Sequence, residues 1–545
     1  MRLARSTFTG TPSAGHRPHY AGLYFDESAA NSAWIREEAT LRLPPCADLP
    51  VVILRGEFRP DPGAAGTASS AVGLTCRVNG VWAAELRSPA PGPFELRLPL
   101  PSNPAHSPCI TLHLEGVGRT NALAWLGRVT GLGPLQRFRA QTRNRQLRIT
   151  TLSTAGGEII FDFSVRLAPC SAAFLRRHTR LGINLAGFLT ADLGVGESAR
   201  CMVRAADAAG IPAALVSLRL PCKNRLGDQT YAARLQDANP HPVNIVHLDP
   251  PASPDLDHYH GKAFRAGKHT IAYWAWELPE FPDAWLPQFA FFDEVWCPSE
   301  FVRTAIAAKS PVPVLTMPHA IAFAPPAGDA RARFGLPAGA FVCLCLYDLN
   351  SYSERKNPRA AIAAFRQSGL GAHGAVLVVK VQNAAGNAAD FAALQDALRD
   401  LPGAILLSET LSRADVYLLE SACDCFVSLH RSEGFGLAVA ECMALGKPVL
   451  STNWSATAEF VHAGNGCPVD YTLTTLARSH GPYSKGQVWA EPDVGHAADW
   501  LRRLAADRAL GATLGAAARA TIATQFSPEV IGARYRRRLE AIAAF

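Results

Sequence analysis

Two glutamates eight positions apart, Glu433 and Glu441, lie in the segment of this 545-residue chain that is best suited to chemistry. A Gly-x-Gly turn follows the first carboxylate, and an apolar stripe at helical spacing leads to the second. The glycines let the backbone approach a ligand, and the helix predicted from Leu437 to Leu445, which Gly446 ends, offers free N–H groups to an anion. The pattern suits a nucleoside diphosphate flanked by two carboxylates that bind hydroxyl groups.

A pair of cations, Arg355 and Lys356, precedes Asn357-Pro358, which opens a predicted helix. Fixed cations can take up the negative charge of a departing diphosphate, the guanidinium through a bidentate fork and the ammonium as a compact charge. The pair follows the first strand predicted in the second α/β half, and ligands of such sheets bind beyond the C-terminal strand ends. This position favours a phosphate site over an exposed basic pair in a loop.

Several segments of the chain resemble a known family. The segment SEGFGLAVAECMALGKPVL at 432–450 resembles the E-x7-E signature of retaining GT-B glycosyltransferases of the family-4 type. Other segments resemble a subset linked to bacterial surface-polysaccharide synthesis, including lipopolysaccharide: GVGESAR (194–200), YWAWELPEFPDAW (273–285), DEVWCPSEFV (293–302), LNSYSERKNP (349–358), SLHRSEGFG (428–436) and VWAEPD (488–493). The resemblance extends over the chain from about Leu181 onward.

The resemblance implies a role for each matching residue. Glu433 would face the hydroxyls of the donor sugar, Glu441 would bind the nucleotide ribose, and Lys356 and Arg355 would stabilise the departing diphosphate. The family has its Arg several residues ahead of its Lys, whereas the two are adjacent here. The remaining donor-side candidates are the residues of the two glycine turns: Gly434, Phe435, Gly436, Leu437, Gly194 and Gly196. Without the resemblance, Gly194-Val195-Gly196 would be an ordinary strand–helix turn.

The acceptor side has a less distinctive pattern. His247 and Asp249 follow a predicted strand and would face the cleft, although a histidine there is more often structural than catalytic. Related enzymes carry a functional His after the strand matched by Thr270–Trp276, but here that strand ends in Ala-Trp-Glu. Glu277 is therefore an alternative to this histidine as a polar group on the acceptor side, and we count it among the candidate catalytic residues. Trp276 either fills the core or stacks on a sugar ring.

We expect neither a metal nor a cofactor, with the nucleotide sugar as co-substrate. Asp255-Leu256-Asp257 matches the D-x-D that other transferases use for a cation, but it lies in a proline-rich segment predicted as a loop. The histidines lack paired metal-ligand spacing. The 13 cysteines include no C-x-x-C, and pairs such as Cys343/Cys345 sit at strand spacing in apolar runs, as small core residues do.

Two kinds of periodicity divide the chain. Residues 1–175 contain short stretches of strand pattern separated by turn residues, among them a hairpin signal at Asn79-Gly80. This pattern predicts an all-β sandwich, which would serve as a carbohydrate-binding or docking module. From there, strands and helices alternate. The predicted fold is α/β GT-B, with two doubly wound Rossmann-like domains facing a cleft: an acceptor-side domain at 176–325 and a nucleotide-sugar domain at 326–527. A basic helix at 528–545 would pack back toward the N-terminal half.

Composition excludes some classes of function. A net charge of +7 without long basic runs and interleaved aromatics argues against nucleic-acid binding. The N-terminus has no apolar segment typical of a signal peptide, and no stretch reaches membrane-spanning length, so we expect a cytoplasmic protein. Seven arginines without an acidic neighbour, from Arg119 to Arg148, form either a solvated face or a surface for an anion or the inner face of a membrane.

The sequence therefore predicts a metal-independent hexosyltransferase, and the resemblance implies that it retains the configuration of the sugar. It would move a sugar from a nucleoside diphosphate to a glycan or lipid-linked glycan, and the resemblance favours mannose. One alternative is a glycan phosphorylase of the same architecture, although no segment resembles its pyridoxal phosphate site. The other is a glycan-binding protein with a degenerate transferase region, which the presence of Glu433, Glu441 and Lys356 opposes.

Overall fold

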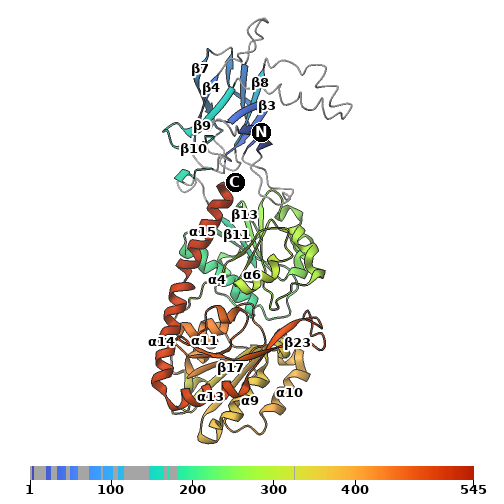
Figure 1. The fold of residues 1–545 in the computed structure, drawn as a ribbon, viewed down its shortest axis with the longest axis vertical. Helices are drawn as coiled ribbons and strands as arrows, with labels where there is room; N and C mark the ends of the chain where they lie inside the picture. Colours follow the sequence, from blue (N-terminus) through green and yellow to red (C-terminus); the bar gives the residue numbers. More distant parts are fainter. Residues whose placement is uncertain are drawn as a thin grey trace. The chain divides into compact units, whose positions relative to one another are not determined.

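The computed structural model describes residues 3–4, 20–25, 33–43, 49–58, 73–87, 90–101, 108–115, 147–164, 170–171, 173–174, 181–324 and 326–544 (Figure 1). The chain forms two compact units, and the boundary between them lies between Leu181 and Gly182. The first unit also contains the last residues of the chain, Arg537–Phe545, and the second extends to Arg536.

The first unit is an antiparallel β structure. Its strands are β1 (Leu3–Ala4), β2 (Tyr20–Phe25), β3 (Ala33–Arg42), β4 (Val51–Phe58), β5 (Gly73–Val78), β6 (Val81–Arg87), β7 (Gly92–Pro99), β8 (Cys109–Glu115), β9 (Leu147–Thr154) and β10 (Ile159–Asp162). The central order is β6-β5-β8-β3-β9-β4-β7. Buried and exposed residues alternate along β7 and β8, so one face of each strand contributes to a single core. This confirms the predicted all-β sandwich.

The hairpin between β5 and β6 turns at Asn79 and Gly80, whose φ angles of 51° and 83° are those of a type I′ turn. Strands β2 and β3 were missed by the sequence pattern, because β3 contains the charged run Arg36-Glu37-Glu38. The arginine-rich segment lies outside the described residues except for Arg148, which is part of β9.

The N-terminal lobe of the second unit is a parallel sheet covered by helices, with the order β12-β11-β13-β14-β15-β16. Its strands are β11 (Ile183–Gly187), β12 (Ala213–Ser217), β13 (Val243–His247), β14 (His269–Tyr273), β15 (Glu294–Cys297) and β16 (Val314–Thr316). Its α-helices are α4 (Gly194–Ala208), α5 (Ser253–His260) and α6 (Glu300–Ala307). The strands are buried along their whole length in β11, β13 and β14, as expected for a parallel sheet covered on both faces.

The C-terminal lobe repeats this design with the order β19-β18-β17-β20-β21-β22. Its strands are β17 (Val342–Asp348), β18 (Val376–Gln382), β19 (Ala404–Leu407), β20 (Cys425–Ser428), β21 (Val449–Thr452) and β22 (Cys467–Val469). Its helices are α7 (Ala330–Arg333), α8 (Ser353–Lys356), α9 (Pro358–Ser368), α10 (Ala388–Leu398), α11 (Arg413–Ala422), α12 (Leu437–Ala444), α13 (Val494–Ala506) and α14 (Arg508–Gln525). The predicted pair of doubly wound domains is confirmed.

Two further elements extend the second unit. Strands β23 (Tyr471–Thr475) and β24 (Val488–Pro492) form a separate antiparallel hairpin. Helix α15 (Pro528–Ala544) begins after α14, and within the second unit it packs on the N-terminal lobe. There the ring of Tyr535 lies 4.7 Å from that of Trp296 in β15. Within the described residues, none of the helices combines the length and the apolar character needed to cross a membrane.

Two local expectations need correction. Strand β14 ends at Tyr273, three residues before its predicted end, so Trp274 and Trp276 belong to the segment that follows the strand. The D-x-D lies in helix α5 and not in a loop, because Pro254 occupies the first turn of this helix, where its missing N–H is not needed. Asp257 forms an ion pair with Arg265, with 2.5 Å between carboxylate oxygen and guanidinium nitrogen.

Candidate active site

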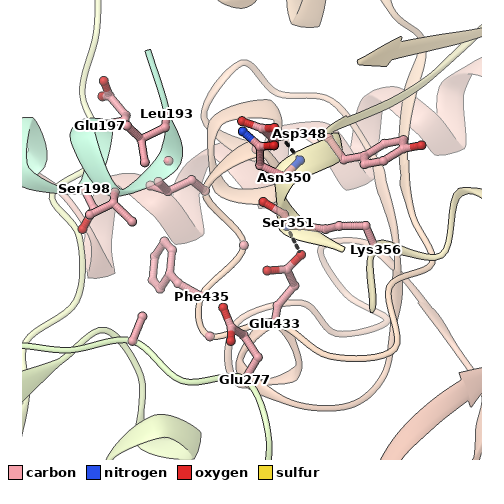
Figure 2. A pocket seen from close by; sticks show the side chains of 18 of the residues that line it. Leu193, Glu197, Ser198, Glu277, Asp348, Asn350, Ser351, Lys356, Glu433 and Phe435 are labelled. Carbon is pink, nitrogen blue, oxygen red and sulfur yellow. Dashed lines mark hydrogen bonds and ion pairs between the residues drawn. The ribbon is translucent and has the colours of Figure 1, made fainter. Parts of the chain in front are cut away.

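A cavity of about 670 Å³ lies between the two lobes of the second unit. Its walls include the segments that follow β11 and β13 in the N-terminal lobe and β17 and β20 in the C-terminal lobe. These are the strands at which the direction of each sheet order reverses, where ligands of doubly wound sheets bind. Figure 2 shows Glu197 and Ser198 of α4 on one side of the cavity and Glu433 and Lys356 on another.

Glu433 is the centre of a compact charge cluster. Its carboxylate lies 2.5 Å from the Lys356 ammonium and 3.1 Å from the Arg355 guanidinium. Burial alone would raise the pKa of the Glu433 carboxyl, but the charges of Lys356 and Arg355 lower it to about 2. The Ser455 hydroxyl accepts a hydrogen bond of 2.9 Å from the Glu433 backbone N–H and fixes the turn. The structure thus brings together the three residues predicted to act at the sugar–diphosphate bond.

The backbone explains how adjacent cations reach one carboxylate. Helix α8 is bracketed by two non-glycine residues with positive φ, Tyr352 at 62° and Asn357 at 51°. Such conformations are uncommon and are held by their surroundings. Arg355 also donates to the Ser432 carbonyl at 2.9 Å, and its own carbonyl accepts from the Arg431 N–H at 2.8 Å. The tight turn lets Arg355 and Lys356 both face Glu433 without intervening residues.

Glu441 has a different environment. It lies buried in α12 and pairs with Arg413, the first residue of α11. The Arg413 Nε atom is also 3.5 Å from Glu197 of the N-terminal lobe, so one guanidinium joins carboxylates of both lobes. Burial raises the pKa of Glu441, against the opposing charge of Arg413. Burial and the charge of Glu441 also raise the pKa of Glu420 well above its usual value.

The glycines of the two turns differ in what they do. Gly436 has a φ of 93°, which favours glycine, and Gly434 lies close to the Trp276 carbonyl, 3.2 Å from where a Cβ would stand. Gly194 lines the cavity with open space where a Cβ would project. A Cβ on Gly196 would lie 2.5 Å from the Ala191 carbonyl, so this glycine serves the packing of α4 and does not line the cavity.

Two apolar donor-side candidates line the cavity as well. Phe435 is buried, and its ring packs against Phe460 and Phe526 at 5.4 Å and 5.5 Å between centroids. Leu437 begins α12, directly after the glycine turn. The side chain of Phe435 therefore anchors the loop that carries Glu433 to the body of the lobe.

Glu277 and Asp249 reach the cavity from the N-terminal lobe. The Tyr483 hydroxyl donates to the Glu277 carboxylate at 3.0 Å, and the Arg355 guanidinium lies 3.8 Å from it. The side chain of Asp249 is exposed to the cavity. The protein atoms around it still remove much of its hydration, and this desolvation, with the charge of Glu277, raises its pKa to about 6. The two carboxylates form the acidic part of the wall.

His247 and Trp276 both line the cavity, and most of each side chain contacts other residues of the protein. The His247 Nε2 atom lies 2.5 Å from the Ser198 hydroxyl, and its Nδ1 atom is enclosed without a partner among the described residues. Trp276 is 1 % exposed, and its ring packs against Trp285 and Tyr483 at 4.9 Å and 5.6 Å. Its indole N–H donates to the Glu280 carbonyl. Trp276 therefore fills the core, because aromatic neighbours cover the ring that a sugar would need.

Several cavity residues were missed by the sequence reasoning: Glu197, Ser198, His319, Lys380, Arg413 and Tyr483. Arg413 carried a usable signal, since a cation at a helix N-terminus is unfavourable unless a carboxylate compensates it. Lys380 is buried in β18, and burial lowers its pKa to about 8. No group of three or more potential ligand residues that could hold a metal ion occurs within the described ranges.

Comparisons with known proteins agree with this geometry. Residues 346–475, which include Lys356, Glu433 and Glu441, match the family described as glycosyl transferases group 1. Alr3699/HepE from Anabaena, solved in complex with UDP and glucose, is similar in structure, with a TM-score of 0.50, 15% identity and coverage of 66% of this chain and 100% of that one. A search of curated proteins finds no match.

Two weaker structural similarities were found. Sucrose-phosphate synthase from Thermosynechococcus elongatus has a TM-score of 0.48, 15% identity and coverage of 66% of this chain and 99% of that one. A point mutant of TarM from S. aureus, in complex with fondaparinux, alpha-GlcNAc-glycerol and UDP, has a TM-score of 0.40, 14% identity and 57% coverage of both chains. The fold is GT-B, and together with the matched domain it supports a glycosyltransferase that uses a nucleotide sugar.

Proposed function

We propose that this protein is a retaining hexosyltransferase that moves a sugar from a nucleoside diphosphate donor to a glycan or lipid-linked glycan. The observation that carries the proposal is the Lys356–Glu433–Arg355 cluster in a cavity at the switch points of two Rossmann-like sheets. The binding of UDP and glucose by the GT-B protein HepE supports a nucleotide-sugar donor. The resemblance of the motifs favours mannose and a place in bacterial surface polysaccharide synthesis, at or near the inner face of the membrane.

The residues divide the reaction between them. Lys356 and Arg355 would hold the diphosphate and stabilise the negative charge that develops as its bond to the sugar breaks. Glu433 would accept hydrogen bonds from sugar hydroxyls, and Glu441 from the ribose. The acceptor hydroxyl would attack on the face that the diphosphate leaves and pass its proton to the departing phosphate, which conserves the configuration. Asp249 and Glu277 would form the acceptor side of the cavity.

This proposal predicts independence from metal ions, because guanidinium and ammonium groups already supply the positive charge at the cavity. We expect UDP, GDP or dTDP to raise the thermal unfolding temperature, since a ligand that binds only the folded state stabilises it by RT ln(1 + [L]/Kd). The corresponding sugar nucleotide should then lose its sugar to an acceptor in the presence of EDTA. The function is wrong if no nucleoside diphosphate stabilises the protein, and an EDTA effect reversed by added metal would refute the metal independence.

A further inference from the structure

His319 lines the cavity, and none of the proposed reaction steps involves it. It follows β16 and is 5 % exposed, and it forms part of the cavity wall. Its ring meets that of Phe435 edge to face, with 4.6 Å between the centroids. Since Phe435 stands two residues after Glu433, His319 lies beside the loop that would hold the donor sugar.

The hydrogen bonds of His319 define where its proton is. The Tyr273 hydroxyl donates to the Met317 carbonyl at 2.8 Å, so its single proton is engaged there. At 3.1 Å from the Tyr273 oxygen, the His319 Nδ1 atom must therefore be the donor, and the Ser198 oxygen, at 3.2 Å, is a second acceptor for the same proton. A neutral ring that carries its proton on Nδ1 has a free lone pair on Nε2.

Ser198 completes the assignment from the other side. With the His319 proton on Nδ1, the Ser198 oxygen accepts from His319, and its hydroxyl proton is left to donate to the His247 Nε2 atom, 2.5 Å away. Burial lowers the pKa of His319 to about 3, with a further contribution from His247, and burial alone lowers that of His247 to about 3. Both rings are therefore neutral at physiological pH. His247 therefore orients the Ser198 hydroxyl, and Ser198 in turn holds the His319 ring.

The His319 Nε2 atom has no hydrogen-bond partner in the described part of the chain, and Nδ1 is held on the protein side. We propose that Nε2 accepts a hydrogen bond from a hydroxyl of a substrate sugar, while Tyr273 and Ser198 hold the ring in the required tautomer. A phosphate oxygen does not fit, because an unprotonated nitrogen cannot donate to it. This inference rests on the proposed function and adds a contact that selects for a sugar hydroxyl.

Two amide substitutions, each of which reproduces only one of the two ring nitrogen positions, separate the roles of the nitrogens. His319→Asn keeps an amide at the Nδ1 position, where it still donates to Tyr273 and Ser198, but it has no atom at the Nε2 position. His319→Gln extends an amide oxygen to that position. For each protein, affinities are measured for UDP, UDP-glucose, GDP and GDP-mannose, together with the acceptor dependence of transfer and the thermal unfolding temperature. Binding of any of these ligands by the unchanged protein tests the proposed function separately.

If Nε2 contacts the donor sugar, His319→Asn binds the sugar nucleotide about threefold to tenfold more weakly, which corresponds to one neutral hydrogen bond, and binds the free nucleotide as before. If it contacts the acceptor, donor affinities are unchanged and the KM for the acceptor rises by a similar factor. His319→Gln restores part of the lost affinity in either case, because it offers an acceptor at the Nε2 position without the Nδ1 contacts to Tyr273 and Ser198. The proposal is overturned if His319→Asn changes neither quantity while folded, or if it weakens the free nucleotide as much as the sugar nucleotide.

Discussion

The Lys356 ammonium and the Arg355 guanidinium hold the same carboxylate but differ in exposure. The side chain of Lys356 is 23 % exposed, whereas that of Arg355 is 5 % exposed and also contacts the Ser432 carbonyl. Arg355 therefore has a large structural role, and Lys356 has the freedom to exchange Glu433 for a phosphate. The family pattern in the sequence indicated both residues, but only the backbone of α8 explains why they are adjacent.

Replacement of Lys356 by alanine tests this division. We expect the rate of sugar transfer to fall by about a hundredfold to a thousandfold, because a fixed charge that stabilises the transition state is lost. The fold should persist, since Glu433 keeps its contact with Arg355. Arg359→Ala is the matched control, because this exposed cation lies three residues further along the chain and outside the cavity. An equal loss of rate in both variants, or none in either, would remove Lys356 from the mechanism.

Asp249 gives the site a testable pH dependence. Its pKa is raised to about 6, so its carboxyl is protonated in the folded protein at pH values where the unfolded chain is already ionised. This group therefore costs stability as pH rises from its ordinary value of 3.8 toward 6, and it is charged in both states above that. If the carboxylate binds the acceptor, transfer should decline as pH falls through about 6. In Asp249→Asn this limb of the rate profile should be absent, and a profile unchanged by the substitution would exclude Asp249.

At the scale of elements, helix α4 carries a buried charge cluster that extends to Arg413 of the other lobe. Glu197 lies in its first turn and contacts Arg200 at 2.8 Å, Arg204 at 2.5 Å and Arg413 of the other lobe at 3.5 Å. Burial would raise the pKa of Glu197, but the charges of Arg413, Arg204 and Arg200 lower it to about 2. A buried carboxylate among three cations is costly to remove, because its loss leaves those charges uncompensated.

We therefore expect Glu197→Gln to destabilise the protein by about 3–5 kcal/mol and to lower the temperature of thermal unfolding. Glu300→Gln is a suitable control in the same lobe, because the pair of Glu300 with Arg303 is partly exposed and should contribute about 1 kcal/mol or less. Both variants are compared by unfolding in urea and by heat. A shift no larger for Glu197→Gln than for Glu300→Gln would contradict the role of the buried cluster.

The elements themselves were largely predictable, whereas the contacts between lobes were not. Apolar runs predicted the strands of both parallel sheets except the edge strands β12 and β22, and Gly446, with a φ of 73°, ends α12 as expected. Arg413 and Glu197 are 216 positions apart in the sequence, and the hydrogen bond between Tyr483 and Glu277 joins residues at a similar separation. No local periodicity encodes such distances. His319 was missed for the same reason, because its proton is positioned by Tyr273 and Ser198 from two other elements.

At the scale of the whole molecule, side chains of each lobe satisfy groups of the other. The Glu459 carboxylate of the C-terminal lobe accepts from the backbone N–H groups of Glu300 and Phe301 at the start of α6, and the Ser299 hydroxyl donates to the Gly434 carbonyl at 2.8 Å. At the other side of the cavity, the Asn224 amide donates to Asp348 at 3.1 Å. These bonds hold the lobes against each other, and their closure over a bound donor would exclude water from the reaction.

Among the residues that the structure describes, those that line the cavity all lie between 192 and 483, within the second unit, and each of the two units has hydrophobic core clusters of its own. We therefore expect a protein of residues 182–536 to bind nucleoside diphosphates with the affinity of the full chain, within about a factor of two to three, since no contact to the ligand is lost. Cooperative thermal unfolding would establish that the shortened protein is folded, and titration calorimetry with UDP and GDP would compare the affinities. Binding to the glycan acceptor or to vesicles with anionic lipids should instead weaken, because the sequence predicts that the sandwich is a carbohydrate-binding or docking module. A folded 182–536 protein that binds nucleotides tenfold more weakly would show that the first unit contributes to the donor site, and equal acceptor and vesicle binding would refute the docking role.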